Sequence, residues 1–237
     1  NPELTVWEIT GDGDCLARGG NHFIHAVRRN IDLNIVLLNN KIYGLTKGQY
    51  SPTTDRGFVT KSSPYGTVED PFIPAELVFG ARGNFFARSM DVETALSQEV
   101  LVEAARHKGT SVVEMLQNCV IFNHNVHNYV TDREFRADRT IQLRHGEKMV
   151  FGKDKNRGLV LDGFLIKAVT IGENGVTMDD ILVHDAKMPE NFLHQQLAMM
   201  DGHELPLALG VIRSVEAPVY DEEVARQVEE VKGRKNY

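Results

Sequence analysis

Two apolar segments on either side of a helical segment set the first constraint on the fold. Residues 6–10, VWEIT, predict a strand that ends at the glycines of GDGD. Residues 33–40, LNIVLLNN, carry an unbroken Ile, Val and Leu run that suits a parallel strand buried on both faces. The segment between them, residues 16–30, has the apolar spacing of a helix. Strand, helix and strand in this order predict a parallel unit.

The alternation of strands and helices continues to about residue 122. The pattern predicts a short helix over 75–82, a strand over 84–91, a helix over 92–108 and a strand over 111–122. The helix over 16–30 is expected to pack through one face that carries Phe23, Ile24 and Val27. This order predicts an α/β fold with a doubly wound, mostly parallel sheet, whose ligands bind outside the carboxyl ends of the strands.

The regular alternation of strand and helix patterns becomes weaker from His124 onward. A charged run, DREFRADR at residues 132–139, is followed by a turn-rich stretch, with short helices expected near 178–183 and 190–200. We therefore expect a domain over residues 1–123 and an extension over residues 124–237 that packs on it. The charged run is interpreted as a solvated face, with a subunit contact as the alternative.

The composition narrows the function classes. The chain has 237 residues, 42% hydrophobic and 25% charged, and a net charge of −7 without a basic block. This balance argues against nucleic-acid or membrane-surface binding. No apolar run is long enough to span a bilayer and no signal-peptide pattern opens the chain, so a cytoplasmic location is expected. Because the chain starts at Asn1 without Met and enters a strand almost at once, further sequence is expected upstream.

The GDGD loop carries two acids where a phosphate loop is expected. A dinucleotide loop needs glycine at its sixth position, which is Leu16 here, and the Walker pattern is absent. A divalent cation between carboxylate and phosphate would make the acids useful, and oxygen ligands suit magnesium. Asn40 ends the next strand, so it should meet Asp12 at one edge of the sheet. The alternative for Asp12 is a helix cap.

Several motifs together resemble a known family. GDG followed at this interval by NN is the thiamine diphosphate motif, and here it lies within GDGDCLARGGNHFIHAVRRN and NNKIYGLTKGQYSPTT. These segments closely resemble the beta subunits of 2-oxoacid:ferredoxin oxidoreductases. The resemblance is strong over residues 5–123 and weaker but continuous afterwards, through MVFGKDKNRGLVLDG and PLALGVIR.

The resemblance implies a fold of the thiamine diphosphate-binding, diphosphate-domain type and a definite activity. This activity is the oxidative decarboxylation of a 2-oxoacid, with 2-oxoglutarate the first expectation, to acyl-CoA and CO2, or the reverse carboxylation. The implied cofactors are thiamine diphosphate, Mg²⁺ and a 4Fe-4S cluster that passes electrons to ferredoxin. The implied partners are an alpha subunit that supplies the pyrimidine-side domain, ferredoxin, coenzyme A and the 2-oxoacid, in an alpha2beta2 heterotetramer.

The resemblance also implies roles for individual residues. Asp12 and Asn40 would bind magnesium through side-chain oxygens, and Ile42 would bind it through its carbonyl. The residues expected to surround the cofactor are Gly11, Asp12, Gly13, Asp14, His22, Asn40, Ile42, Gly44, Leu45 and Thr46.

Cys119 matches the fourth ligand of the family's cluster, whose other three cysteines precede the GDG strand. The alternative is a buried thiol. Cys15, the other cysteine, matches no ligand position, and the spacing of the two does not predict a disulfide.

Two further sites carry open alternatives. Leu45 and Lys47 are expected to influence substrate choice, since a cation beside the reacting centre suits the second carboxylate of 2-oxoglutarate. The alternative for Lys47 is a solvated loop lysine. His22 and His25 are three residues apart on a helix but lack the partners of a metal motif, so packing is expected for His25.

Two other functions compete with the oxidoreductase interpretation. One is a non-oxidative thiamine diphosphate-dependent decarboxylase or carboligase subunit, which LTKGQ and the cysteine of QNCVIFN argue against. The other is a nucleotide-binding or subunit-interaction module without catalysis, which the missing sixth-position glycine disfavours.

Overall fold

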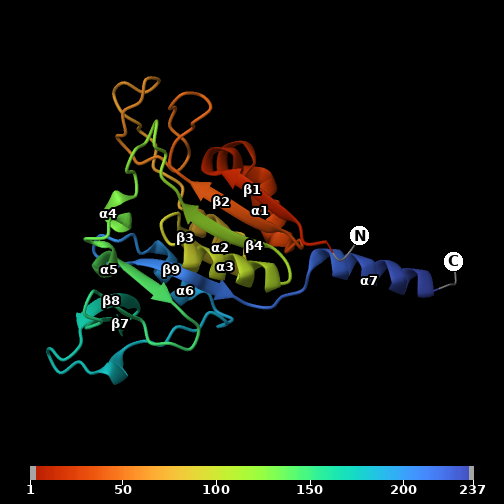
Figure 1. Ribbon diagram of the computed structural model, residues 1–237. Coiled ribbons are helices and arrows are strands. Elements are labelled where there is room, and N and C mark those ends of the chain that lie inside the picture. The colour runs from red at the N-terminus through yellow and green to blue at the C-terminus, as the bar shows by residue number, and fades with distance from the viewer. Residues whose placement is uncertain (1–3, 235–237) are drawn as a thin grey trace.

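The computed structural model describes residues 4–234, so the outermost residues of the two predicted regions, 1–3 and 235–237, lie outside the described residues. Its centre is a six-stranded sheet in the order β1-β2-β4-β3-β9-β5, and a three-stranded sheet, β6-β7-β8, lies beside it (Figure 1). The main sheet contains β1 (Trp7–Gly11), β2 (Asn34–Asn39), β3 (Phe85–Met90), β4 (Ser111–Leu116), β5 (Thr140–Leu143) and β9 (Leu207–Ser214). The small sheet contains β6 (Val150–Phe151), β7 (Arg157–Asp162) and β8 (Leu165–Thr170).

The helices connect and cover these strands. They are the π-helix η1 (Asp14–Arg18), α1 (Gly20–Arg29), α2 (Pro74–Gly80), α3 (Thr94–Arg106), α4 (Asn128–Thr131), α5 (Arg136–Arg139), the 3-10 helix η2 (Met178–Asp180), α6 (Phe192–Met199) and α7 (Tyr220–Gly233). None of the described helices is long and apolar enough to cross a membrane.

The predicted α/β fold with a mostly parallel sheet is confirmed. β1, β2, β4 and β3 run parallel to one another, and β9 is antiparallel to β3. The last pair, β5 with β9, is again parallel. The carboxyl ends of β1, β2, β3 and β4 therefore lie at one edge of the sheet, where long loops project in Figure 1.

The main sheet crosses the predicted boundary at residue 123. Strands β5 and β9 belong to the 124–237 region, yet they extend the sheet beyond β3. Only part of that region, which includes the small sheet, lies outside the central sheet. The division into two units at residue 123 stays a prediction.

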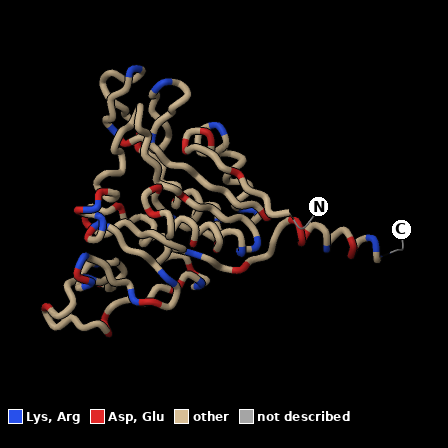
Figure 2. Tube along the Cα trace, viewed as in Figure 1, with Lys and Arg blue, Asp and Glu red and all other residues tan. Residues whose placement is uncertain are grey.

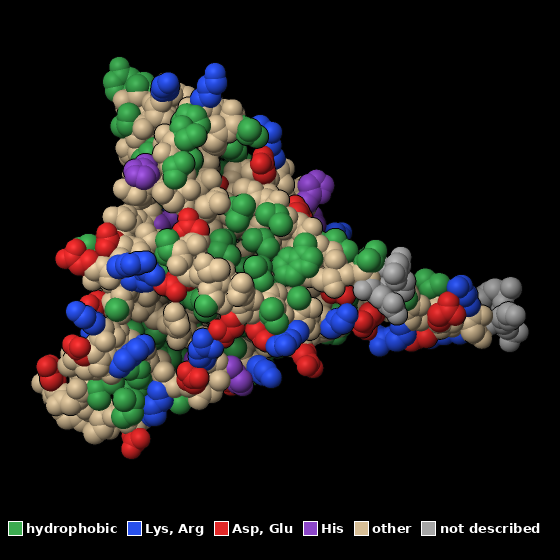
Figure 3. Space-filling view, in the orientation of Figure 1, with side chains coloured by type: hydrophobic (Ala, Val, Ile, Leu, Met, Phe, Trp, Pro, Cys, Tyr) green, Lys and Arg blue, Asp and Glu red, His purple; other side chains and the backbone are tan. Residues whose placement is uncertain are grey.

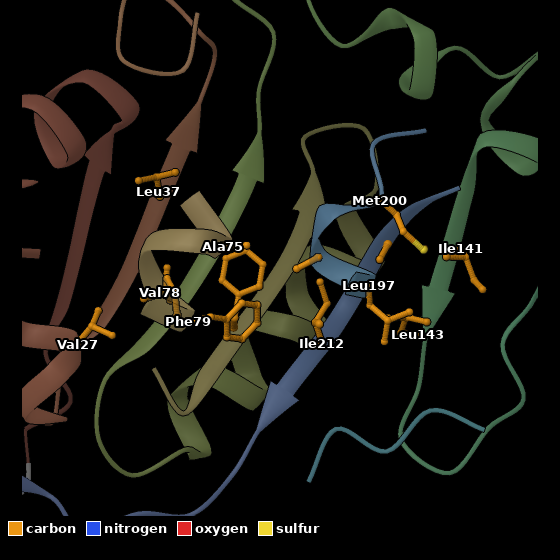
Figure 4. Close-up of a cluster of buried hydrophobic side chains, with 14 of the residues drawn as sticks. Val27, Leu37, Ala75, Val78, Phe79, Ile141, Leu143, Leu197, Met200 and Ile212 are labelled. Carbon is orange, nitrogen blue, oxygen red and sulfur yellow. The ribbon is translucent and has the colours of Figure 1, made fainter. Parts of the chain in front are cut away.

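Alternation along the strands places two apolar layers on opposite faces of the sheet. Phe85 and Phe86 are adjacent and both buried, and each joins a different hydrophobic cluster. The Phe86 cluster packs against α1, α2 and α6, and Figure 4 shows Val78 and Phe79 of α2 in it. The Phe85 cluster packs against α3. Helices therefore cover both faces of the sheet.

The single helix expected over residues 16–30 is wrong in two respects. It is interrupted at Gly19, which lies between η1 and α1 and whose N–H donates to the carbonyl oxygen of Asp14 at 2.7 Å. A Cβ at this position would lie 2.9 Å from the same oxygen, so the interruption favours glycine. Phe23 and Val27 are buried, but Ile24 is 39% exposed. Residues four apart share a helix face, and Ile24 lies to the side of the face that Phe23 and Val27 define.

The strand expected over residues 111–122 is also too long. β4 ends at Leu116, whose neighbours Asn39 and Met90 end β2 and β3. With no strand beside it, the chain turns, and Cys119 pairs only with Asn123 in an isolated bridge. The expected helix near 178–183 is reduced to η2, and the one near 190–200 corresponds to α6.

The surface leaves apolar groups exposed at the β1 edge. Trp7 is 37% and Ile9 is 69% exposed, and Figure 3 shows apolar side chains gathered over this part of the sheet. Helix α7 extends away from the body and buries none of its described side chains (Figure 1). In the charged run 132–139 most side chains are exposed, as expected, although Arg136 pairs with Glu93 of the α3 N-cap.

Candidate thiamine diphosphate site

The GDGD loop and the NN pair meet at the carboxyl edge of the sheet. β1 and β2 are adjacent and parallel, and their last registered pair is Gly11 with Leu38. The next residues along each strand are Asp12 and Asn39, so the register places them side by side. The ends of the two strands thus lie side by side, as predicted, but the β2 residue beside Asp12 is Asn39, because β2 ends one residue before Asn40. The meeting of Asp12 with Asn40 and the ligand roles of both residues stay predictions.

Asp12 is a buried carboxylate surrounded by hydroxyl groups. Its side chain is 1% exposed, and the hydroxyls of Ser51 and Thr53 donate to its Oδ2, the latter at 2.5 Å. Burial raises the pKa of Asp12, and these hydrogen bonds only partly oppose the effect. Within residues 4–234 no lysine or arginine forms an ion pair with Asp12. A buried carboxylate without a cationic partner fits a divalent cation.

Asn40 and Ile42 lie in a turn that other side chains hold in place. The Ile42 N–H donates to the Asn40 Oδ1 at 3.2 Å, which closes a local turn. Asn123 donates through Nδ2 to the carbonyls of Asn40 at 3.1 Å and Lys41 at 3.2 Å. Lys41 adopts a φ of 55° within this turn. The amide oxygen of Asn40 and the carbonyl of Ile42 suit the ligand chemistry expected of magnesium.

Gly13 has a steric reason to be glycine. A Cβ at this position would lie 2.0 Å from Cε1 of Tyr43, whose hydroxyl donates to the Gly13 carbonyl at 3.1 Å. Its backbone is helical, with φ −66° and ψ −44°, so the restriction comes from the tyrosine ring and not from the dihedral angles. The two glycines of GDG differ in this respect, because a Cβ at Gly11 would meet no atom within 4 Å.

The turn after Asn40 is exposed at its tip. Gly44, Leu45, Thr46 and Lys47 are all exposed, and Leu45 is 98% exposed. Lys47 has a φ of 67° beside Gly48 at 95°. Figure 2 shows basic residues at the tips of the loops that project beyond this edge of the sheet. The predicted roles of these four residues are not tested by contacts within the chain.

His22, Asp14 and His25 lie outside this hydroxyl-rich centre. His22 and His25 line a cavity of about 430 Å³ between β1 and α1, together with Glu8. No hydrogen bond in the described chain joins His22 to the GDGD loop, and its cofactor role stays a prediction. Asp14 is exposed and begins η1.

The two cysteines are free and have different surroundings. Cys15 is buried, and burial with the nearby carboxylates of Glu8 and Asp12 raises its pKa to about 12. Cys119 is partly exposed in the turn that follows β4. The described residues contain no group of three or more His, Cys, Asp or Glu side chains able to hold a metal ion. The role of Cys119 as a cluster ligand stays a prediction.

Sequence reasoning missed several residues that support the site. These are Ser51, Thr53, Asn123, His127 and Glu114. Ser51 and Thr53 belong to the SPTT segment, whose proximity to NNKIYGLTKGQ was the only available signal. His127 Nε2 donates to the carbonyl of Asn39 at 2.9 Å, and burial lowers the pKa of this histidine.

Comparison with known families agrees with this geometry. Residues 1–115 match the model of the C-terminal TPP-binding domain of thiamine pyrophosphate enzymes. The fold and the arrangement of the GDGD and NN segments therefore define a thiamine diphosphate-binding domain.

Relatives of known name narrow the class. The chain is 43% identical over 227 residues to the 2-oxoglutarate oxidoreductase subunit KorB of Mycobacterium tuberculosis, covering 95% of this chain and 60% of that protein. It is 50% identical over 118 residues to the 2-oxoglutarate synthase subunit KorB of Archaeoglobus fulgidus, covering 50% of this chain and 44% of that protein. The chain belongs to the family of 2-oxoacid:ferredoxin oxidoreductase beta subunits.

A solved structure shows the same architecture. The 2-oxoglutarate:ferredoxin oxidoreductase from Magnetococcus marinus, with 2-oxoglutarate, coenzyme A and succinyl-CoA bound, superimposes with a TM-score of 0.70 at 25% identity. The match covers 100% of this chain and 66% of that chain. The chain thus spans less than two thirds of the length of each of these three proteins.

Proposed function

We propose that the chain is the catalytic beta subunit of a 2-oxoacid:ferredoxin oxidoreductase. The reaction is the oxidative decarboxylation of 2-oxoglutarate, or a related 2-oxoacid, to acyl-CoA and CO2, or its reverse. The observation that carries the proposal is the buried Asp12 carboxylate, which lies without a cationic partner at the ends of two adjacent parallel strands. The names of the relatives support the substrate class.

In this proposal the chain holds the diphosphate half of the cofactor. Asp12 and Asn40 bind Mg²⁺ through side-chain oxygens and Ile42 binds it through its carbonyl, while the GDGD loop and the turn to Thr46 surround the diphosphate. Bound thiamine diphosphate would supply the carbon nucleophile and the electron sink for decarboxylation. Ser51 and Thr53 hold the Asp12 carboxylate in place by hydrogen bonds to one of its oxygens.

The remaining parts of the activity need groups from outside the described chain. An alpha subunit would supply the pyrimidine-side domain, in an alpha2beta2 assembly, and ferredoxin would accept electrons from a 4Fe-4S cluster with Cys119 as one ligand. Long loops project beyond the carboxyl edge of the sheet (Figure 1), and in this proposal they contact the alpha subunit. A cytoplasmic location is part of the same proposal.

Magnesium-dependent cofactor binding is the first test. In the complete complex, titration calorimetry should show thiamine diphosphate binding that EDTA abolishes, and Asp12→Asn should weaken it at least about a hundredfold. Asp154→Asn, an exposed acid in a turn of the second region, is the matched control and should bind like the wild type. Binding that survives EDTA or the Asp12 substitution would contradict the assignment.

A second measurement separates the proposal from the non-oxidative alternative. The complex should contain iron and should reduce ferredoxin when 2-oxoglutarate and coenzyme A are present together. Release of CO2 without ferredoxin reduction or iron would favour a decarboxylase or carboligase.

Lys47 is proposed to influence the choice of 2-oxoacid. Support for this role comes from its exposed position in the turn that follows the proposed magnesium ligands, since a cation there suits the second carboxylate of 2-oxoglutarate. Lys47→Ala should reduce kcat/KM for 2-oxoglutarate relative to pyruvate by about tenfold, with Lys61→Ala in the neighbouring exposed loop as control. An unchanged ratio of the two kcat/KM values would show that Lys47 does not influence substrate choice. The role expected for Leu45 in the same turn would then lose its support.

A further inference from the structure

A row of buried polar side chains crosses the sheet and ends at Asp12. It begins at Arg88 of β3, continues through Glu114 of β4 and Asn39 of β2, and reaches Asp12 through Thr53. Arg88 and Glu114 are register partners in adjacent strands, and Asn39 lies two residues beyond Leu37, the β2 partner of Glu114. The side chains therefore share one face of the sheet.

Along this row, the acceptors of Glu114 determine which atom of the next side chain donates. Arg88 Nε donates to Glu114 Oε2 at 2.7 Å, and Asn39 Nδ2 donates to Glu114 Oε1 at 2.8 Å. A carboxylate only accepts, so Glu114 fixes the amide of Asn39 with its nitrogen toward β4 and its oxygen toward Thr53. The Thr53 hydroxyl must then donate, and its single proton is shared between Asp12 Oδ2 at 2.5 Å, the closer acceptor, and Asn39 Oδ1 at 3.0 Å.

The charges at the start of the row are deeply buried. The side chains of Arg88 and Glu114 are 4% and 3% exposed. Burial alone would raise the pKa of Glu114, but the charge of Arg88 and the hydrogen bonds hold it below its usual value. Arg88 also donates to the carbonyls of Ala198 at 3.0 Å and Ala208 at 3.4 Å, which anchor it to α6 and β9.

Stability alone does not explain this pair. Replacing a buried ion pair by apolar side chains of similar volume is often neutral or stabilising. The feature that an apolar pair could not reproduce here is the fixed orientation of the Asn39 amide, which is the only side-chain link from the pair toward Asp12 among the described residues.

We propose that Arg88 and Glu114 are positioning residues that orient the Asp12 carboxylate for its metal through Asn39 and Thr53. The inference rests on the proposed function, because it assigns to these residues a role in magnesium and thiamine diphosphate binding. It adds residues that lie outside the GDGD and NN segments and on two strands that contribute no ligand.

The test compares two arginines of similar burial. Arg213 of β9 is 6% exposed and donates to the carbonyls of Gly83, Met188 and Pro189, without a link to Asp12. In the complete complex, Arg88→Met and Arg213→Met should both lower the midpoint of thermal unfolding. With Mn²⁺ as the probe, electron paramagnetic resonance should show about tenfold weaker binding in the presence of thiamine diphosphate for Arg88→Met. The Mn²⁺ affinity of Arg213→Met should stay within twofold of that of the wild type.

A double variant separates orientation from folding. Arg88→Met combined with Glu114→Leu removes both buried charges, so the fold should be retained even where the single variant is unstable. It should still bind Mn²⁺ about tenfold more weakly than the wild type. Wild-type affinity in the folded double variant, or an equal loss in Arg213→Met, would overturn the positioning role. Absence of Mn²⁺ and thiamine diphosphate binding in the wild type would instead overturn the proposed function.

Discussion

Gly13→Ala should destabilise the protein through one contact that the structure identifies. The new Cβ would lie 2.0 Å from Cε1 of Tyr43, and ordinary contact begins at 3.4 Å, so the ring must move by about 1.4 Å. Overpacking of this kind costs about 1–3 kcal/mol. Displacing the ring also removes the hydrogen bond from its hydroxyl to the Gly13 carbonyl, which contributes about 1 kcal/mol.

One effect opposes these losses. The helical dihedral angles of Gly13 are accessible to alanine, which reduces the entropy of the unfolded chain and stabilises by about 0.4–1 kcal/mol. The net loss in the free energy of unfolding is therefore about 2 kcal/mol. For a protein of this size that corresponds to a fall of roughly 4–8 °C in Tm.

Thermal unfolding without thiamine diphosphate measures this effect, and the same loop offers a control. Gly11→Ala, where a Cβ meets nothing within 4 Å, should change Tm by less than a quarter as much. In a Tyr43→Ala background the Gly13→Ala substitution should lose most of its effect. Equal shifts for the two glycines, or an unchanged loss without the tyrosine ring, would refute the steric explanation.

Three further predictions concern other buried groups. Burial lowers the pKa of His184 to about 4, so the unfolded chain binds more protons than the native one below the ordinary pKa of about 6.5. Stability should be complete above pH 6.5, decrease by roughly 3 kcal/mol as the pH falls from 6.5 to 4, and level off below, and urea unfolding should show a smaller decrease for His184→Gln. Cys15 should resist iodoacetamide at pH 8 in the folded protein and react in urea, as mass spectrometry would show, because its thiol is buried and its pKa is raised to about 12. Phe23→Ala should lower the free energy of urea unfolding by about 3–5 kcal/mol, whereas Ile24→Ala should change it by no more than about 0.5 kcal/mol. Equal losses would mean that Ile24 belongs to the buried helix face, as the sequence predicts.

Some errors of the sequence interpretation have a common origin. The apolar run after Leu116 predicts a longer strand, yet β4 ends there because β2 and β3 end at the same level. Ile24 satisfies the helical spacing but lies beside the buried face, since the neighbouring elements determine which part of an apolar stripe is covered. In both cases the local pattern allows more than one structure, and the packing of distant segments determines which one forms.

The sequence by itself determined the features that adjacent residues encode. Alternating strands and helices predicted the parallel sheet, and the GDGD and NN segments predicted which strand ends converge, since both lie within one strand-helix-strand unit. Only the tertiary structure decided that β4 lies between β2 and β3 and that β9 extends the sheet. It likewise brought Thr53 to Asp12 and Arg88 to Glu114. Hydrogen bonds between distant segments depend on strand order and register, which long-range packing determines and no local pattern records.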